Sequence, residues 1–445
     1  MRAKSSSDMS GKQSGLLRAR LPLAAAALML LHALGAGAAE EAASAAEGAV
    51  SAEPVAAEPA APVDPIVARG KYLAIAGNCA SCHTAGDGQL LAGGVAFTTP
   101  FGKIYSPNIT PDAETGIGNW TAEQFLQSLR KGVRPNGDHL YPVFPYTAFT
   151  KVTDEDAAAL FAYLKSVPAV SNQAPANEMS FPFNQRSLMF VWKALFFDEG
   201  AYKPNAAKSA EWNRGAYLIE GLAHCSACHS PRNFMGAERS SMAMTGGEYT
   251  ARVPTDELRA WSSPNLTPVP NGLGGWPVEE IAAYLKTGKN TFVSTFGPMN
   301  EVILNSTSHL NDADVKAMAV YLKDLTPNAG DVGSAPSADV MSAGSLLYDV
   351  HCGTCHLPTG LGGEDTGPRL AGNPVLQASN PASLINVILY GPELPKPTLP
   401  THWKIMEAYG DKLSDDDVAA LASFMRSSWG NKAGAVTAAQ VAKQR

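Results

Sequence analysis

A five-residue pattern, Cys-x-x-Cys-His, occurs three times in this 445-residue chain and uses all six of its cysteines. The copies span residues 79–83, 225–229 and 352–356. Two intervening residues let a short turn present both thiols to one porphyrin edge, and the adjacent histidine can ligate the iron. A redox dithiol needs no such histidine, and a zinc site needs four ligands. The pattern therefore predicts three covalent haem c groups. The attachment residues are Cys79, Cys82, Cys225, Cys228, Cys352 and Cys355, and the axial histidines are His83, His229 and His356.

Length and charge narrow the class further. A chain of this length is expected to form about three domains, which matches one haem per domain. The formal net charge is −7, which argues against a nucleic-acid partner. Only 17% of the residues are charged, whereas 45% are hydrophobic.

The N-terminal segment has the pattern of a secretory signal. Arg18 and Arg20 precede an apolar run over 21–34, and Ala-Gly-Ala at 36–38 fits a cleavage site. An uncleaved anchor is the alternative, but the run is shorter than the roughly 20 residues of a membrane span. We therefore expect residues 1–39 to be removed on export to the bacterial periplasm, where c-type haem is attached.

The same order of elements surrounds each motif. A helix leads into the first cysteine, and a later helix begins at Thr153, Asn311 or Ser414, each with an acidic residue three positions on. Such a pair of crossing helices is the plan of cytochrome c. We expect a mainly α fold of three tandem cytochrome c-like haem domains joined by linkers. The aromatic residues expected in the crossings are Tyr163, Tyr321 and Phe424.

These elements set the expected boundaries. Ala, Pro and Glu dominate residues 40–65, which predicts a disordered leader. Unit one, unit two and unit three denote the three expected haem domains below. The units span 66–175, 209–327 and 339–431, with an apolar linker at 176–208, a second linker at 328–338 and a tail at 432–445.

Units one and two are closer relatives of each other than of unit three. Ser-Pro-Asn-Ile-Thr-Pro at 106–111 matches Ser-Pro-Asn-Leu-Thr-Pro at 263–268, and each is followed by a Gly-rich turn and a tryptophan. Unit three lacks this insert. The pattern indicates an internal repeat of two units followed by a more distant relative.

The second axial ligands are predicted from position. A methionine opposite the histidine raises the potential of a haem and is expected in a loop before the capped helix. Met299 in unit two and Met406 in unit three meet this condition. Unit one has Phe144 at the corresponding place. Three possibilities stay open there: Met189 reaching back from the linker, His139 as a second histidine, or an iron that is five-coordinate or carries only water.

The apolar linker contains a dense hydrophobic run at residues 188–197 with one charge. It is too short to span a bilayer. One interpretation is a helix buried between domains. The other is an interfacial membrane anchor, which charged substitutions at Phe190 and Phe197 are expected to release.

The three motifs, the repeated inserts, Leu-Tyr-Pro at 140–142 and Ser-Ser-Trp-Gly-Asn at 427–431 resemble the triple-haem cytochrome c subunits of bacterial membrane-bound dehydrogenases, such as those of acetic acid bacteria. The resemblance covers the expected mature chain. It implies a large catalytic subunit, ubiquinone as acceptor, and a site at the periplasmic surface of the inner membrane.

Unit one departs from the usual pattern. The segments at 141–146 and 181–186 are more similar to cytochromes that accompany molybdopterin-dependent aldehyde dehydrogenases, which add a small iron–sulfur subunit. The alternative partner is a PQQ alcohol dehydrogenase.

Two functions from different classes follow. The first is an electron relay through three haems, with no catalytic residue in this chain. The second is a haem enzyme that uses an open iron at haem 1, motivated by the missing methionine. The sequence shows no dinucleotide fingerprint, P-loop or nucleophile elbow.

Overall fold

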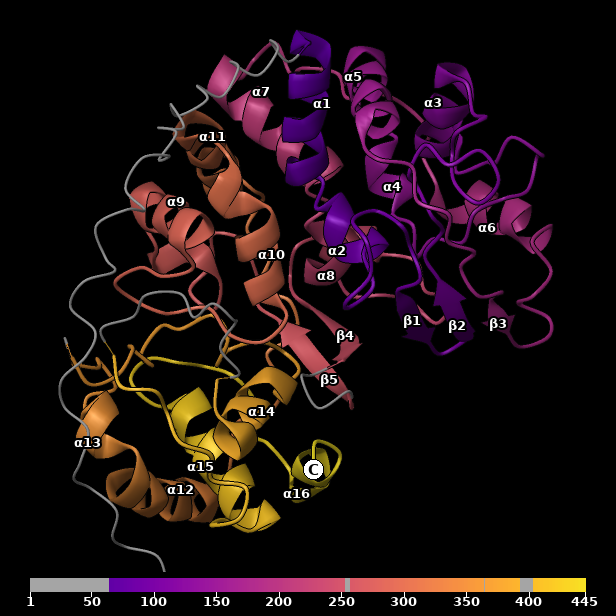
Figure 1. The fold of residues 1–445 in the computed structure, drawn as a ribbon. Helices are drawn as coiled ribbons and strands as arrows, with labels where there is room; N and C mark the ends of the chain where they lie inside the picture. Colours follow the sequence, from indigo (N-terminus) through magenta and orange to yellow (C-terminus); the bar gives the residue numbers. More distant parts are fainter. Residues whose placement is uncertain (1–63, 253–256, 364, 393–402) are drawn as a thin grey trace, which may run out of the picture. The chain divides into compact units, whose positions relative to one another are not determined.

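The computed structural model describes residues 64–252, 257–363, 365–392 and 403–445. The predicted signal sequence, residues 1–39, and the predicted leader up to residue 63 lie outside this part of the chain. Helices dominate what is described (Figure 1), which confirms the expectation of a mainly α fold.

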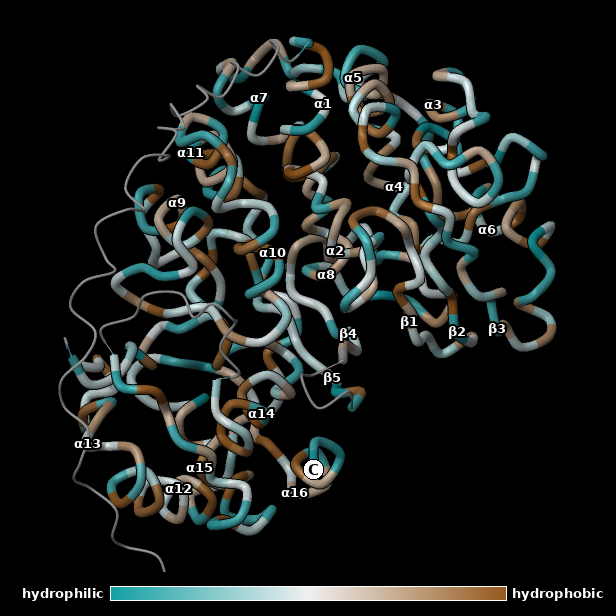
Figure 2. The backbone as a smooth tube through the Cα atoms, viewed as in Figure 1, coloured by the Kyte–Doolittle hydropathy of each residue, from teal (hydrophilic) through white to brown (hydrophobic). Residues whose placement is uncertain are grey.

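Three pairs of helices pack against each other, and along the chain one Cys-x-x-Cys-His motif lies between the two helices of each pair (Figure 1). The first helix of each pair runs toward the motif, and the second closes the unit. Hydrophobic residues, brown in Figure 2, recur along these helices. The pairs are α1 (Pro65–Ala76) with α5 (Asp154–Ser166), α7 (Ala210–Tyr217) with α11 (Asp312–Lys323), and α12 (Ala338–His351) with α15 (Asp415–Ser427).

A glycine sits at the crossing point of each pair. A Cβ atom on Gly70 would lie 1.9 Å from the Ala159 carbonyl oxygen and 2.7 Å from Cβ of Tyr163. The same construction on Gly215 and Gly344 meets a carbonyl oxygen at 2.0 Å and 2.2 Å. Only glycine allows this approach of two helix backbones. Tyr163 and its counterparts lie beside these glycines, as the sequence predicts.

The predicted helix caps are confirmed. The Thr153 side chain accepts a hydrogen bond from the amide of Asp156 over 3.2 Å. Asn311 caps α11 in the same way, and Ser414 forms a reciprocal capping box with Asp417. These bonds satisfy amides that a helix leaves without partners at its N-terminus.

Short helices carry the motifs themselves, and other short elements fill the loops around them. Two small antiparallel sheets accompany them, with strand orders β1-β2-β3 and β4-β5. The motif helices are α2 (Cys79–His83), α8 (Ser226–His229) and α13 (Gly353–His356). The strands are β1 (Ala96–Thr99), β2 (Gly102–Tyr105), β3 (Glu178–Met179), β4 (Gly247–Arg252) and β5 (Leu258–Ser263). The remaining helices are α3 (Ala122–Lys131), α4 (Tyr146–Phe149), α6 (Leu188–Phe196), η1 (Leu218–Leu222), η2 (Ser240–Met242), η3 (Leu273–Gly275), α9 (Val278–Thr287), α10 (Met299–Asn305), η4 (Thr307–His309), α14 (Ala382–Tyr390) and α16 (Ala438–Ala442).

The hydrophobic core follows the repeat pattern of the sequence. One continuous cluster contains buried residues of both unit one and unit two, including Leu73, Leu160, Ile219 and Met318. A second cluster belongs to unit three and the segment after it, where Val441 of α16 is fully buried. The segment that the sequence set apart as a tail is therefore packed against unit three.

Unit three contacts unit two through α14 and β5. The Ser262 amide donates to the Ser383 hydroxyl over 2.9 Å, and that hydroxyl donates to the Ser262 carbonyl over 2.7 Å. The Asn386 amide group also donates to the Ala260 carbonyl over 2.8 Å. These polar contacts are buried, so they fix how α14 lies on the strand.

The apolar linker forms α6. This helix has one buried face, as expected for a helix between domains, and one exposed apolar face, as expected for an interfacial anchor. Met189 and Trp192 are buried in a small third cluster. Phe190, Val191 and Leu195 on the same helix are 67%, 53% and 64% exposed. The helix is thus anchored by one face, and its other face is apolar and open to solvent.

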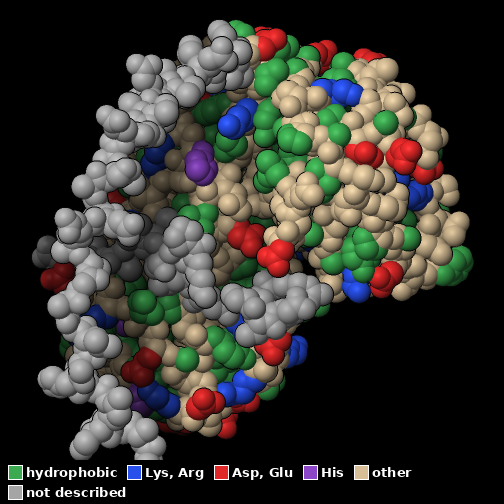
Figure 3. Space-filling model, in the orientation of Figure 1, with side chains coloured by type: hydrophobic (Ala, Val, Ile, Leu, Met, Phe, Trp, Pro, Cys, Tyr) green, Lys and Arg blue, Asp and Glu red, His purple; other side chains and the backbone are tan. Residues whose placement is uncertain are grey.

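Acidic and basic side chains are interspersed on the face shown in Figure 3. Across the described residues, none of the helices has both the length and the apolar character that crossing a bilayer requires.

Candidate haem sites

The three motif histidines share one hydrogen-bond arrangement. Nδ1 lies 2.8 Å from the Pro107 carbonyl for His83, 2.9 Å from the Pro264 carbonyl for His229, and 2.8 Å from a carbonyl, that of Pro368, for His356. A carbonyl oxygen can only accept, so Nδ1 carries the proton and Nε2 keeps its lone pair. Metal-ligating histidines are oriented in this way.

The electrostatics of these histidines point in the same direction. Burial lowers the pKa of His83, His229 and His356, and the carbonyl contact raises it by a smaller amount. Each imidazole is therefore neutral at physiological pH. A neutral ring with a free Nε2 is the form that can bind iron.

The repeated inserts build the carbonyl partners in units one and two. Asn108 Oδ1 accepts hydrogen bonds from the backbone amide and hydroxyl of Thr110 over 2.9 and 2.8 Å. Asn265 and Thr267 repeat both contacts at 2.8 Å. These side-chain-to-backbone bonds fix the loop after the proline, so its carbonyl faces the histidine. The repeated Ser-Pro-Asn insert is the sequence signal for this role.

The motif thiols lack the features of a redox dithiol. Burial raises the pKa of Cys79, Cys225 and Cys352 to about 12 in each case. Burial also raises the pKa of Cys82, to about 11. Reactive dithiols contain a thiol with a lowered pKa, so these positions suit thioether attachment better than disulfide exchange.

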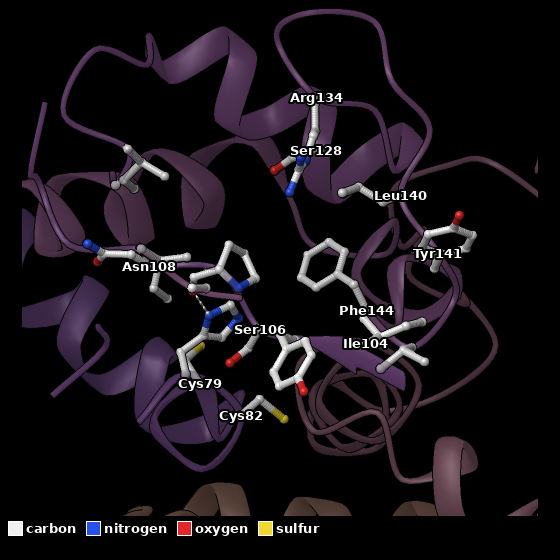
Figure 4. Close-up of a pocket in the computed structure, with 18 of the residues that line it drawn as sticks. Cys79, Cys82, Ile104, Ser106, Asn108, Ser128, Arg134, Leu140, Tyr141 and Phe144 are labelled. Carbon is white, nitrogen blue, oxygen red and sulfur yellow. Dashed lines mark hydrogen bonds between the residues drawn. The ribbon is translucent and has the colours of Figure 1, made fainter. Parts of the chain in front are cut away.

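A cavity of about 760 Å³ adjoins the first motif, a volume within the range that accommodates cofactors. Figure 4 shows Cys79 and Cys82 at one end and Arg134 at the other. Asn108 lies on one side, and the ring of Phe144 points into the space from the other. The cavity thus offers thiols for one edge of a flat macrocycle and a cation for the edge beyond.

Arg134 and Arg186 give this cavity two cationic side chains. Burial and the nearby charge of Arg186 lower the pKa of Arg134. Within the described residues no hydrogen bond or ion pair is formed by the Arg134 guanidinium, while Arg186 donates to the His139 carbonyl over 2.9 Å. A partly desolvated cation requires an anionic partner. The two carboxylates of a haem, at the edge away from its thioethers, fit this requirement.

A second cavity, of about 310 Å³, brings together the predicted ligands of unit three. Cys352, Cys355, His356 and Met406 all line it. Met406 is half-buried and packs against the core of unit three. The structure therefore places the predicted sixth ligand and the motif histidine at one site.

Met299 has a comparable setting in unit two. It is the first residue of α10 and packs, half-buried, against the shared core. Cys225 of the second motif packs against the same core.

The structure does not bring Met189 or His139 to the first motif. Met189 is buried with Trp192 in the third hydrophobic cluster, and it does not line the first cavity. His139 also lies outside that lining, and its Nδ1 is 2.9 Å from the ammonium of Lys193. Both side chains are held by α6 and its surroundings. Phe144, in contrast, lines the first cavity.

His224 is the unexpected member of the first cavity. It directly precedes Cys225 of the second motif, yet its side chain lines the cavity of the first. Its Nε2 lies 3.3 Å from the Gly77 carbonyl oxygen. Its position directly before a cysteine of the second motif gives no sign, in the sequence, that its side chain enters the site of another unit.

Crossing helix pairs that accompany Cys-x-x-Cys-His turns define the class of c-type cytochromes, and the sequence comparisons agree. Residues 67–168 match the cytochrome c family, and residues 339–425 match the family described as cytochrome c oxidase, cbb3-type, subunit III. The chain is similar over most of its length to cytochrome subunits of dehydrogenases, and it belongs to that family.

Three relatives illustrate the similarity. The fructose dehydrogenase cytochrome subunit of Gluconobacter japonicus is 38% identical over 89% of this chain and 86% of its own length. The cytochrome c subunit of the alcohol dehydrogenase (quinone) of Gluconacetobacter polyoxogenes is 38% identical over 85% of this chain and 84% of its own. A nicotinate dehydrogenase subunit of Pseudomonas putida is 43% identical over 80% of this chain, which spans only 30% of that longer protein.

Proposed function

We propose that the chain carries three covalent haems c, one in each of three cytochrome c-like domains, and relays electrons from a catalytic dehydrogenase subunit to ubiquinone. The single observation that carries this proposal is the threefold recurrence of a motif histidine held by a proline carbonyl. A haem so held supplies reversible one-electron chemistry. Each domain follows the bounds 66–175, 209–327 and 339–431.

The residues of the chain take distinct roles in this proposal. The six motif cysteines attach the haems, and His83, His229 and His356 orient one Nε2 toward each iron. Met299 and Met406 supply the sixth ligands of haems 2 and 3. Phe144 leaves haem 1 without a sixth protein ligand, and Arg134 with Arg186 compensates the charge of its carboxylates.

The partner proposed first is a molybdopterin-dependent aldehyde dehydrogenase with a small iron–sulfur subunit, because of the segments around Phe144 and at 181–186. A PQQ alcohol dehydrogenase is the alternative. The word quinone in the name of the Gluconacetobacter relative supports a quinone as the electron acceptor. We place the complex on the periplasmic side of the inner membrane, after cleavage of residues 1–39.

Mass spectrometry of the chain from gently solubilised membranes tests this proposal. We expect the intact mass to exceed that of the processed polypeptide by three haems, and the Cys225→Ala/Cys228→Ala variant to lose one of them. A large molybdopterin subunit should co-purify; a quinoprotein would select the alternative partner. Fewer than three haems on the wild-type chain would refute the relay as stated.

The exposed face of α6 is the proposed membrane contact. Its Phe190, Val191 and Leu195 side chains are exposed and apolar, as in helices that lie in the headgroup region. Phe197 is unsuitable for a test, since it packs edge-on against Tyr146 with ring centroids 5.2 Å apart. We expect Phe190→Glu/Leu195→Glu to move the assembled complex from the membrane to the soluble fraction.

A matched control separates this contact from general apolar exposure. Leu346 in α12 is 67% exposed, and Leu346→Glu should leave membrane binding unchanged. Flotation of the purified complexes with liposomes measures the difference. If the double α6 variant floats as well as the wild type, the membrane contact lies elsewhere.

A further inference from the structure

Two hydrogen bonds run reciprocally between units one and two. The Tyr72 hydroxyl in α1 donates to Asp314 in α11 over 2.6 Å. The Tyr217 hydroxyl in α7 donates to Asp156 in α5 over 2.5 Å. Each tyrosine therefore reaches the first turn of the helix that closes the other unit. An exchange of one contact in both directions is characteristic of a two-fold interface.

Each aspartate of this exchange is also paired within its own unit. Asp156 accepts from Nε of Arg69 over 2.8 Å, and Asp314 accepts from Nε of Arg214 over 2.7 Å. Burial, and then the contact with Asp314, raises the pKa of Tyr72 to about 12, so its hydroxyl stays a donor. The arginine compensates the carboxylate charge, and the tyrosine adds the contact between units.

Unit three does not take part in such an exchange. Tyr72 and Tyr217 each stand two residues after the glycine of the helix crossing, and in unit three this position is Leu346, which has no hydroxyl. Tyr348 of the same helix donates to the Leu357 carbonyl of its own unit over 2.6 Å. Tyr348 is therefore a tyrosine whose hydroxyl bonds within one unit and can be removed as a control.

The hydrogen bonds of Tyr72 and Tyr217 hold units one and two together, and the first and second motifs lie at this interface. The Asn305 side-chain amide of unit two donates to the Ser81 hydroxyl, inside the first motif, over 2.9 Å. This contact joins a residue of unit two directly to the first motif.

His224 connects the two sites covalently and by contact. It is bonded through the chain to Cys225, which we propose attaches haem 2, and its ring lines the cavity of the first motif. Phe149, another residue of that cavity, packs edge-on against this ring with centroids 5.4 Å apart. The ring is thereby fixed between the cavity and the second motif.

We infer that units one and two form a pseudo-two-fold di-haem module in which His224 bridges haem 1 and haem 2, and Tyr72 and Tyr217 are positioning residues that hold the two sites together. The inference rests on the proposed function. One electron leaves the reduced haem and enters its oxidised neighbour, with no bond or proton exchanged. Electrons thus pass directly between haems 1 and 2.

Photoinduced electron injection into the holo-complex tests this module. All six cysteines lie in the motifs, so a Gln173→Cys substitution adds one free thiol at an exposed residue that lines the first cavity. A ruthenium photoreductant attached there reduces haem 1 in a flash. Time-resolved absorbance then follows electron transfer to haem 2. In the protein that carries only the Gln173→Cys substitution, we expect the electron to equilibrate between haem 1 and haem 2 in a fast phase.

Two independent changes should remove the fast phase. His224→Asn deletes the ring while retaining a residue that tolerates the left-handed backbone at this position, where φ is 37°. Tyr72→Phe/Tyr217→Phe deletes both inter-unit hydroxyls. The control His351→Asn changes the histidine that directly precedes the third motif, and the control Tyr348→Phe removes a hydroxyl that bonds within unit three. Both should keep the fast phase. Haem content and static spectra, measured first, verify that each variant is folded and fully loaded.

The outcomes are distinct for the module and for the proposed function. Three haems with an undiminished fast phase in both the His224 and the double-tyrosine variants overturn the module and leave the relay intact. A wild-type chain with fewer haems contradicts the proposed function itself. Loss of a six-coordinate haem 1 spectrum in His224→Asn would identify His224 as an iron ligand and overturn its role as a bridge.

Discussion

The Phe144→Met variant is expected to acquire a low-spin haem 1 with a higher midpoint potential. Phe144 lines the first cavity and offers no lone pair, whereas a thioether in its place supplies a sixth ligand that stabilises the reduced iron. Axial ligands tune haem potentials over about 0.8 V, so we expect a rise on the order of 100 mV. Spectroelectrochemical titration of the holoprotein measures this shift.

Carbon monoxide gives an independent readout of the same site. We expect CO to bind the reduced wild-type protein at haem 1 and to be excluded in Phe144→Met. Phe144→Leu is the matched control, since it shortens the side chain without adding a donor atom, and it should retain CO binding. A wild-type protein with three CO-resistant haems would show that another residue already fills the sixth position.

The second large effect is expected at a helix crossing. Gly70→Ala would place a Cβ atom 1.9 Å from the Ala159 carbonyl oxygen, and backbone cannot yield as a flexible side chain would. Forcing atoms into packed interiors costs about 1–3 kcal/mol and occasionally more, so we expect a loss of about 3 kcal/mol. Denaturant unfolding of the haem-loaded protein, followed by far-UV circular dichroism, measures the free energy of unfolding.

Gly275→Ala is the control for this prediction. No heavy atom lies within 4 Å of a Cβ built on Gly275, and its backbone φ is outside the left-handed region. Its free energy of unfolding should stay within about 0.5 kcal/mol of the wild type, as for most surface changes. Equal stability of Gly70→Ala and Gly275→Ala would mean that α1 and α5 can separate without cost.

Features set by local chemistry could be predicted from the sequence. The cap residues Thr153, Asn311 and Ser414 act on amides three positions away, so their pattern is visible in the chain. The motif histidines follow from the spacing to their cysteines. Met406 was found because its position relative to a capped helix limits which cavity it can reach.

Features set by long-range packing could not be predicted in this way. Met189 was a candidate ligand because it is a nearby methionine in sequence, but α6 directs it into a different cluster. Arg134 belongs to no sequence motif, and only the structure shows that its side chain lines the first cavity. His224 covers the site of another unit, which a scheme of separate domains cannot anticipate. The tyrosine exchange likewise joins residues 242 and 61 positions apart.

The shared core of units one and two limits how the chain can be dissected. Because Leu73 and Leu160 pack in the same cluster as Ile219 and Met318, a cut in the linker at 176–208 would expose apolar surface on both fragments. Residues 66–327 form the smallest N-terminal piece suited to separate expression. Units one and two therefore have to be expressed together, although each contains its own motif.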